Sequence, residues 1–416
     1  MKRFRIVPPD APHEFSPELP LSKSIANRQL CIRHLAGSTL RYPIPDSWDS
    51  IIMNTLLHQL SQENNCRVFD CGDAGTVFRF LTALLAVSEG EHTITGSARM
   101  LLRPCGPLVS ALQSLGAEIS YLGSHGFPPL RIKGKPLSGG SVDIDASVSS
   151  QFISALMMIA PLMPLGLQIR LTGKTVSAPY ITMTARLMQA QGIDIGETKD
   201  QITIRPGSYR FNADITEADW SAASYWFAFA AMNEDSVIRL RGLKENSIQG
   251  DSRLVEIFSH LGVSTLRDGE VLVVRRHGKT DAQIEVDFTP FPDLFPAVAV
   301  TCAALGVTSK FTGLETLSIK ESNRSEAVGT ELGKLGYMIS EPDGCFRIGQ
   351  GKVNTAESIT ETYNDHRIAM AFAMMAAVND HLIIDNPGVV AKSYPGFWED
   401  MRRAGFLILP EGEDAL

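Results

Sequence analysis

Apolar residues in this chain form runs that alternate between helical and strand-like spacing. Five stretches share one pattern, in which a helix-like segment is followed by a glycine and then by a short strand-like segment. They are "ALQSLGAEISYL", "RLMQAQGIDIGE", "EIFSHLGVSTLR", "ELGKLGYMIS" and "DMRRAGFLIL". A glycine directly after a helix adopts the left-handed cap conformation without strain. Each stretch therefore predicts a helix that ends at its glycine and turns into a strand.

The glycines of these stretches recur every 69 to 76 residues, at Gly116, Gly192, Gly262, Gly336 and Gly405. A near-constant period of this length predicts a repeated α/β module. A helix followed by a glycine and a strand is common in α/β proteins, so the motif alone is weak evidence for a repeat. The even spacing of the five copies is the stronger evidence. A sixth copy near "TLLHQLSQENNCRVFD" lacks the glycine and is the least regular.

Polar residues precede the longest apolar runs, which we expect to be buried helices. In "TYNDHRIAMAFAMMAA", residues 362–377, Asn364 is the expected N-cap and Asp365 an acid of the first turn. Arg367 follows at once, although the start of a helix carries a partial positive charge. A cation at this place needs a negative neighbour, from the protein or from a ligand.

Three further helix starts combine capping residues with cations. They are "LSKSIANRQLCIRHL" with Lys23 and Arg28, "DCGDAGTVFRFLTALLAV" with Arg79, and "SIKESNRSEAVGTELGKLG" with Lys320 and Arg324. Free N–H groups at a helix start, together with a Lys or Arg, make an anion site. A solvated surface side chain explains any single case equally well. Four such starts in one acidic chain favour a shared anionic ligand.

Two other groups of polar residues stand at helix starts. "DASVSSQFISALMM" has Ser147, Ser149, Ser150 and Gln151 but no cation, and neutral donors of this kind bind phosphates or hydroxyl groups. A plain Ser N-cap explains one of these serines but not the whole set. Asp293 and Glu321 are either acids that serve a helix start or, in a pocket full of cations, proton-transfer groups.

Composition limits the class of protein. The 416 residues suffice for two or three domains, and the net charge of −8 argues against a nucleic-acid binder. The six cysteines form no CxxC pair and no metal-like cluster with histidine. The first residues lack the apolar stretch of a signal peptide, and no run is long enough to span a bilayer. We expect a cytoplasmic protein with reduced thiols and without a bound metal.

Several of these stretches, with others, resemble the enolpyruvyl transferase family. They are "LSKSIANR", "GDAGTVFR", "LLRPCGPLVSALQSLGAEI", "SVSSQFISALMMIAPL", "SAPYITMTARLM", "PDLFPAVAV", "IKESNRSEA", "TYNDHRIAMAF" and "AKSYPGFWEDM". They stand in the family's order from about residue 20 to residue 400, and "SVSSQF" and "YNDHRIAM" are the most specific. The resemblance implies an α/β fold of two inverse α/β barrels, each built from three βαβαββ-type units, with one unit of the N-terminal domain shortened.

The resemblance also implies how the chain is divided. Residues 20–216 would form an N-terminal domain on the shikimate 3-phosphate side. Residues 1–19 and 217–416 would form a C-terminal domain on the phosphoenolpyruvate side, with crossings near residues 20 and 216. We expect a monomer whose domains close around its ligands.

The site residues follow from the resemblance, position by position. Those implied for shikimate 3-phosphate are Lys23, Ser24, Arg28, Ser149, Ser150, Ser177 and Tyr180. Those implied for phosphoenolpyruvate are Arg103, Lys320, Arg324, Arg367 and Lys392, with Gly75 and Thr76 allowing close approach of the backbone. Gln151 would lie between the two substrates. The residues implied in catalysis are Asp293, Glu321, Lys23 and Lys392.

The implied activity is transfer of the enolpyruvyl group of phosphoenolpyruvate to the 5-hydroxyl of shikimate 3-phosphate, as in aromatic amino acid biosynthesis. Addition gives a tetrahedral intermediate, and elimination releases phosphate without a metal or organic cofactor. Two alternatives remain at this point. One is a transferase acting on UDP-N-acetylglucosamine. The sequence lacks a Pro-Gly-Gly-Cys loop, which argues against this alternative. The other is a non-catalytic relative that binds anions.

The chain departs from the family pattern at four places. Leu21 stands where the family has Gly, Asp73 where it has Asn, and Phe80 where it has Pro, and the segment 46–73 is shorter. Leu21 restricts the backbone, and Asp73 either weakens anion binding or serves as a harmless N-cap. These departures bear on affinity more than on the class of reaction.

Overall fold

The computed structural model describes residues 2–9, 14–38, 46–62, 66–210, 215–349, 351 and 359–411. The chain divides into two compact units: unit 1 comprises the residues up to Ser22 and from Glu217 onward, and unit 2 runs from Lys23 to Thr216. The two segments that connect the units pair with each other. Leu21 forms an antiparallel bridge with Ala218, and Ser22 N donates to Glu217 O at 2.8 Å.

In the part of unit 2 that the structure describes, the strands form two four-stranded sheets. The strand order of the first is β3 (Cys66–Asp70), β4 (Gly90–Thr95), β6 (Leu130–Gly134) and β5 (Glu118–Tyr121). The order of the second is β7 (Gly140–Asp145), β8 (Leu167–Thr172), β10 (Gln201–Ile204) and β9 (Ile195–Glu197).

The described residues of unit 1 form three four-stranded sheets. The first has the order β12 (Val263–Asp268), β13 (Val271–Arg276), β11 (Val237–Arg241) and β2 (Glu14–Phe15). The second has the order β14 (Gln283–Asp287), β15 (Thr308–Thr312), β17 (Phe346–Gly349) and β16 (Met338–Ser340). The third has the order β18 (Ile359–Thr360), β19 (Leu382–Asp385), β1 (Arg3–Val7) and β20 (Leu407–Glu411).

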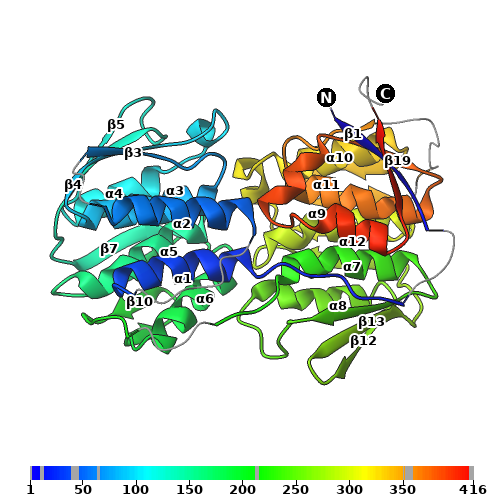
Figure 1. Cartoon of the computed structure of the whole chain (residues 1–416), viewed down its shortest axis with the longest axis horizontal. Helices are drawn as coiled ribbons and strands as arrows, with labels where there is room; N and C mark the ends of the chain where they lie inside the picture. The colour runs from blue at the N-terminus through cyan, green and yellow to red at the C-terminus, as the bar shows by residue number, and fades with distance from the viewer. Residues whose placement is uncertain are drawn as a thin grey trace. The chain divides into compact units, whose positions relative to one another are not determined.

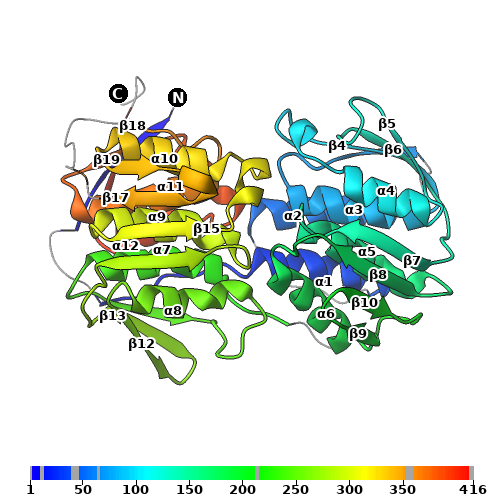
Figure 2. The ribbon, with the colours of Figure 1, turned by 180° about the vertical axis from the view of Figure 1, so that it is seen from behind.

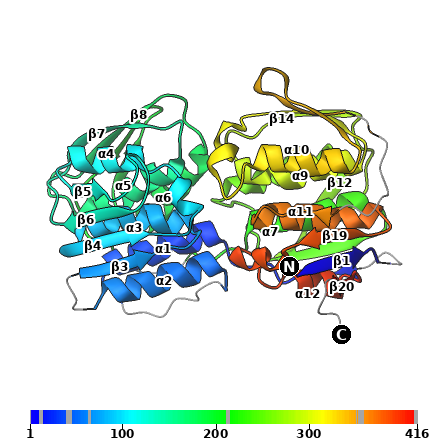
Figure 3. The same cartoon turned by 90° about the horizontal axis from the view of Figure 1, so that it is seen from above.

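All five sheets share one pairing pattern. Each has one parallel pair at an edge, namely β3/β4, β7/β8, β2/β11, β14/β15 or β18/β19, and its two other pairings are antiparallel. In the last sheet the third strand is β1, from the beginning of the chain, as Figure 3 shows near the label N. The same supersecondary unit therefore recurs along the chain.

The helix–glycine–strand prediction is confirmed. Helices α4 (Gly106–Ser114), α6 (Ala178–Ala190), α8 (Leu254–Ser259), α10 (Arg324–Lys334) and α12 (Phe397–Arg403) each end shortly before one of the five glycines. These glycines have φ values between +82° and +95°, and a strand of the sheet follows each of them. Near the irregular sixth copy, α2 (Trp48–Leu60) is followed by β3 without a glycine, and residues 63–65 lie outside the described part of the chain.

Each unit has three inner helices. In unit 1 these are α7 (Trp220–Met232), α9 (Phe295–Ala304) and α11 (His366–Met374), which pack on one another. Every residue of α7 and α11 is buried, and so is every residue of α9 except Ala304 at its end. Their sequences are rich in Ala, Val, Phe and Met on all sides, as is typical of a helix without a solvent face. Figure 1 shows the three side by side within the unit.

In unit 2 the inner helices are α1 (Lys23–Leu35), α3 (Gly75–Val87) and α5 (Ser150–Ile159), which also pack on one another (Figure 2). None of the helices in the described residues is long and apolar enough to cross a membrane.

Candidate active site

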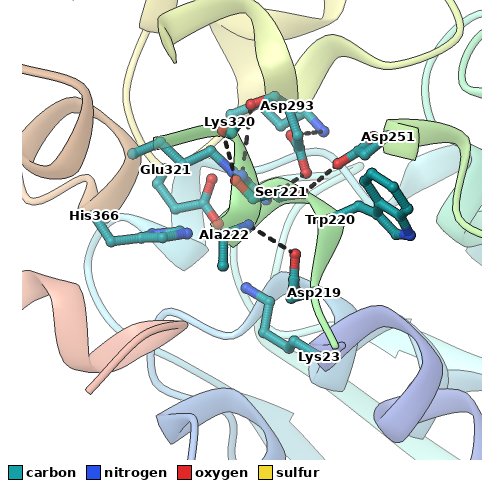
Figure 4. A network of polar contacts seen from close by, with 12 residues as sticks. Lys23, Asp219, Trp220, Ser221, Ala222, Asp251, Asp293, Lys320, Glu321 and His366 are labelled. Atoms are coloured by element: carbon teal, nitrogen blue, oxygen red, sulfur yellow. Dashed lines mark hydrogen bonds and ion pairs between the residues drawn. The ribbon is translucent and has the colours of Figure 1, made fainter. Parts of the chain in front are cut away.

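Three inner helices of unit 1 start at one polar cluster. Ser221 lies in the first turn of α7, Asp293 in the turn η4 (Pro292–Leu294) that leads into α9, and Arg367 in the first turn of α11. Arg367 Nη2 donates to Asp293 Oδ2 at 2.9 Å and lies 3.4 Å from Ser221 Oγ. Figure 4 shows Ser221 and Asp293 at this cluster. Helix starts carry partial positive charge, so three of them in one place favour an anion.

Arg324 is the centre of an ion-pair network in this cluster. Its side chain is 1% exposed, and each of its three nitrogens contacts a carboxylate. Nη1 donates to Asp293 at 2.7 Å, Nη2 to Glu321 at 2.7 Å, and Nε to Asp365 at 2.8 Å. A planar guanidinium with several N–H donors suits this arrangement better than an ammonium group. Arg324 therefore fixes the positions of Asp293 and Glu321 relative to each other.

Asp293 lies among cations. Besides its contacts with Arg324 and Arg367, it pairs with Lys320 Nζ at 3.4 Å. Burial alone would raise the pKa of the Asp293 carboxyl, but the charges of Arg367, Lys320 and Arg324 outweigh it and hold the pKa well below the usual range. Asp293 is thus ionised at neutral pH before any ligand enters.

Glu321 bridges two cations of the cluster. Its Oε2 accepts from Arg324, and its Oε1 lies 3.4 Å from Lys392 Nζ at the end of η8 (Pro387–Lys392). The side chains of Glu321 and Lys392 are 13% and 10% exposed. A carboxylate and an ammonium group in contact at the edge of a cluster are suited to proton transfer.

The cap of α11 differs from the prediction. The N-cap is Asp365, whose Oδ1 accepts from Arg367 N at 2.9 Å, and not Asn364. Asn364 precedes it in the left-handed region, with φ +55°. The buried Asp365 carboxylate also accepts from Arg324 and from Ser322 Oγ, at 3.0 Å. The Arg367 guanidinium itself pairs with Asp293, which is therefore the negative neighbour that this cation requires.

Asp251 is a site residue that the sequence analysis missed. It lies in η3 (Gly250–Arg253), is 3% exposed, and accepts a short hydrogen bond from Ser221 Oγ, as Figure 4 shows. Burial, reinforced by the negative charge of Asp293, raises the pKa of Asp251 to about 6. In the sequence it stands between "SIQG" and "SRL", so nothing local distinguishes it from a surface acid.

Asp251→Asn is expected to stabilise the protein at neutral pH. A folded-state pKa of about 6 against 3.8 for the unfolded chain means that stability falls as the pH rises through that window. Removing the charge should add up to about 3 kcal/mol above pH 6 and nothing below pH 4. Thermal unfolding at pH 4 and pH 7.5 measures the effect. The exposed Asp235→Asn serves as control, and equal gains at both pH values would contradict the prediction.

In unit 2, Lys23 is the first residue of α1. Its Nζ lies 3.0 Å from Oδ2 of Asp49 in α2, and the side chains are 13% and 3% exposed. Asp49 was also missed by the sequence analysis, because an acid in the first turn of a helix is ordinarily explained by the helix dipole. The structure instead gives it as the counter-ion of the predicted catalytic lysine.

Arg28, one turn further along α1, is 2% exposed. Its donors contact Thr184 Oγ1 at 2.6 Å, Ser154 Oγ at 3.1 Å, and the carbonyl oxygens of Ser24 and Tyr180 at 2.9 Å and 3.3 Å. Within the described residues, none of its partners is a carboxylate. A buried cation that is surrounded by neutral acceptors attracts an anionic ligand.

Two guanidinium groups lie against the N-terminus of α3. A Cβ atom built on Gly75 would lie 2.5 Å from Arg103 Nη1 and 2.7 Å from Arg79 Nη1. Arg79 Nη1 also donates to Gly75 O at 2.9 Å. The next residue, Thr76, accepts from Gln151 Nε2 at 3.2 Å, which links the starts of α3 and α5.

The serines of "SVSSQF" lie at the start of α5. Ser149 is its N-cap and accepts from Gln151 N at 3.3 Å, and Ser150 is buried as the first helical residue. Ser177 caps α6 with φ +53°, in the left-handed region that non-glycine residues rarely adopt. Strained backbone of this kind is frequent at functional sites. Tyr180 lies in the first turn of that helix.

The three departures at single residues have defined environments. Leu21 is extended in its bridge with Ala218. Asp73 is exposed and accepts a short hydrogen bond from Ser97 Oγ. The N-cap of α3 is Ala74, so the suggestion that Asp73 caps this helix is wrong. Phe80 is fully buried within α3.

The predicted residues therefore form two sets, each within its own unit. Unit 1 brings together Asp293, Lys320, Glu321, Arg324, Arg367 and Lys392. Unit 2 carries Lys23, Ser24, Arg28, Gly75, Thr76, Arg103, Ser149, Ser150, Gln151, Ser177 and Tyr180. The repeated α/β units thus place cations and buried carboxylates at the starts of their inner helices, an arrangement that suits the binding of anions.

The comparisons with known proteins give the family. Residues 18–401 match the family described as EPSP synthase (3-phosphoshikimate 1-carboxyvinyltransferase). A 3-phosphoshikimate 1-carboxyvinyltransferase of Bacteroides fragilis is 44% identical over 393 residues, which cover 94% of this chain and 95% of the relative. The protein of that name from Aliivibrio fischeri is 34% identical over 409 residues, covering 92% and 95%. The chain belongs to the EPSP synthase family.

Solved structures share the fold. An EPSP synthase from Acinetobacter baumannii superposes with a TM-score of 0.79 at 22% identity, covering 99% of this chain and 100% of the other. A second structure of EPSP synthase from that organism gives a TM-score of 0.74. At this identity, the likeness concerns the two-unit α/β fold alone.

Proposed function

We propose that the protein is a transferase that moves the enolpyruvyl group of phosphoenolpyruvate to the 5-hydroxyl of shikimate 3-phosphate and releases phosphate. The observation that carries the proposal is the network around Arg324, in which two carboxylates suited to proton transfer are held among four cations. Membership of the EPSP synthase family supports this acceptor. The names of the matched relatives favour it over UDP-N-acetylglucosamine.

The residues divide between the two substrates. Those proposed for shikimate 3-phosphate are Lys23, Ser24, Arg28, Ser149, Ser150, Ser177 and Tyr180. Those proposed for phosphoenolpyruvate are Gly75, Thr76, Arg103, Lys320, Arg324, Arg367 and Lys392, with Gln151 serving both. The substrates bring several phosphate and carboxylate charges, whose burial requires fixed cations. The buried Arg28 with its neutral partners supports its assignment to an anionic group.

The proton transfers fall to Asp293 and Glu321. Attack of the 5-hydroxyl on C2 of phosphoenolpyruvate removes a proton from oxygen and adds one at C3. Elimination then removes a proton from the new methyl group as the phosphate leaves. Asp293 is a weak base while Arg367, Lys320 and Arg324 neutralise it. When the oxyanions of the bound substrates form ion pairs with these cations, the cations neutralise Asp293 less. The pKa of Asp293 then rises, and the carboxylate becomes able to accept the hydroxyl proton.

A phosphate-release assay with both purified substrates tests the proposal. We expect phosphate to be released only when shikimate 3-phosphate and phosphoenolpyruvate are both present. Release with UDP-N-acetylglucosamine as acceptor would support the alternative substrate instead. Thermal stabilisation by both ligands without any phosphate would indicate a non-catalytic binding protein.

Gly75→Ala is expected to raise the KM for phosphoenolpyruvate by about tenfold or more. The added methyl group would displace the guanidinium groups of Arg103 and Arg79, which lie 2.5 Å and 2.7 Å from its position. Steady-state kinetics measure the change, with Gly333→Ala as control because its Cβ would meet nothing within 4 Å. An unchanged KM would show that Gly75 does not contribute to the binding of phosphoenolpyruvate.

We also propose the finer architecture. Each unit would be an inverse α/β barrel of three βαβαββ repeats, with helices inside and sheets outside. The three equivalent sheets of unit 1 and the two of unit 2 support this, with the shortened repeat in unit 2. The protein would act as a monomer, which size-exclusion chromatography with light scattering would test.

A further inference from the structure

Arg28 lies against aromatic rings as well as polar groups. Its Cζ lies 5.3 Å from the centroid of the Phe80 ring and 5.9 Å from that of Tyr180. Phe80 lies in the middle of α3 and is fully buried. A guanidinium within about 6 Å of a ring centroid is attracted by the negative face of the ring.

The polar contacts of Arg28 with the described residues do not use all of its donors. The described residues accept four hydrogen bonds from it, one from Nε, one from Nη1 and two from Nη2. An arginine side chain has five N–H donors, so one Nη1 hydrogen has no acceptor among the described residues. Burial lowers the pKa of Arg28 to about 10, so the side chain remains a cation at neutral pH.

We infer that Phe80 is a positioning residue for the acceptor substrate: its ring supports the Arg28 guanidinium in the orientation that leaves one Nη1 hydrogen for an oxyanion. The neutral partners of Arg28 do not supply the negative charge that a buried cation needs. The ring supplies part of this stabilisation without occupying a donor. A carboxylate in its place would compete with the ligand for the remaining N–H. The inference rests on the proposed function, in which Arg28 binds shikimate 3-phosphate.

The ordinary alternative is that Phe80 only fills the core. That role predicts a loss of stability on truncation and no selective effect on a ligand. Phe78 provides the comparison, because it lies two residues earlier in α3 and is 1% exposed. The rings that lie near the Arg28 guanidinium are those of Phe80 and Tyr180, and Phe78 is not one of them. The same Phe→Leu change at the two positions therefore separates packing from support of Arg28.

The test measures the Kd of shikimate 3-phosphate by calorimetry for the full-length wild type, Phe80→Leu, Phe78→Leu and Arg28→Gln. We expect Phe80→Leu to weaken binding about 5- to 30-fold, with kcat and the KM for phosphoenolpyruvate within twofold of wild type. Phe78→Leu should lower the Tm and leave the Kd unchanged. Arg28→Gln should weaken binding more than either.

A second series replaces Phe80 by mono-, di- and trifluorinated phenylalanine. Fluorine withdraws charge from the ring face at almost constant shape, so Kd should rise step by step with each fluorine. A Kd that stays the same across the fluorinated variants would overturn the role of Phe80, and so would equal Kd values for Phe80→Leu and Phe78→Leu. The proposed function would stand in either case. Normal binding by Arg28→Gln would overturn the assignment of Arg28 and the inference with it, whereas no binding by the wild type would overturn the proposed function itself.

Discussion

Replacing Glu321 by Gln is expected to lower kcat by about 10²- to 10⁴-fold, the usual range for a lost proton-transfer group. Gln keeps an oxygen that can accept from Arg324 Nη2, now 2.7 Å from the carboxylate, so the network should hold its shape. It cannot take up or release a proton beside Lys392. Steady-state kinetics with both substrates, and calorimetry for binding, measure the two effects separately.

Glu326→Gln is the matched control, because this glutamate lies in α10 close to Glu321 and is exposed. It should behave as wild type. A Glu321→Gln enzyme with normal kcat and only a higher KM would show that the carboxylate binds substrate without transferring a proton.

The second large effect is expected for Arg367→Ala, which should lower kcat/KM by roughly 10²-fold or more. The change removes a charge-assisted hydrogen bond of 2.9 Å to Asp293 and a cation from the start of α11. It also removes the charge that contributes most to the lowered pKa of Asp293. The pKa of Asp293 should therefore rise.

The sign of this shift gives a separate measurement. A higher pKa means that Asp293 stays protonated up to a higher pH. The acidic limb of the profile of kcat/KM against pH should therefore move to higher pH. Arg402→Ala is the control, because Arg402 is an exposed arginine paired with Glu399 at 3.5 Å. A profile that keeps its acidic limb in Arg367→Ala would exclude Asp293 as the group titrating there.

Much of the fold was predictable because its determinants are local. The five capping glycines stand where only a left-handed residue fits, and apolar runs such as that of α11 have no polar face to expose. The cap of α11 was misplaced by one residue. Asn364 and Asp365 are both good capping residues, and the contact between Asp365 and Arg324, far away in the sequence, decides between them.

The cations of the site were predictable for a similar reason, since a Lys or Arg at a helix start is conspicuous. Of the carboxylates, Asp293 and Glu321 were predicted as well, but Asp49 and Asp251 were not. Asp49 and Asp251 look like ordinary acids in the sequence, and only the fold brings Asp49 to Lys23 and Asp251 to Ser221. Pairing of buried charges depends on tertiary contacts, which local spacing does not encode.

The position of β1 has a consequence for biosynthesis. This strand pairs with β19 and β20, so Arg3 has its sheet partners at Asp385 and Glu411. Unit 2 is one continuous stretch and can fold while the ribosome is still adding later residues. The last sheet of unit 1 must wait until Leu407–Glu411 has been synthesised, and β1 has neither of its partner strands until β19 and β20 follow it.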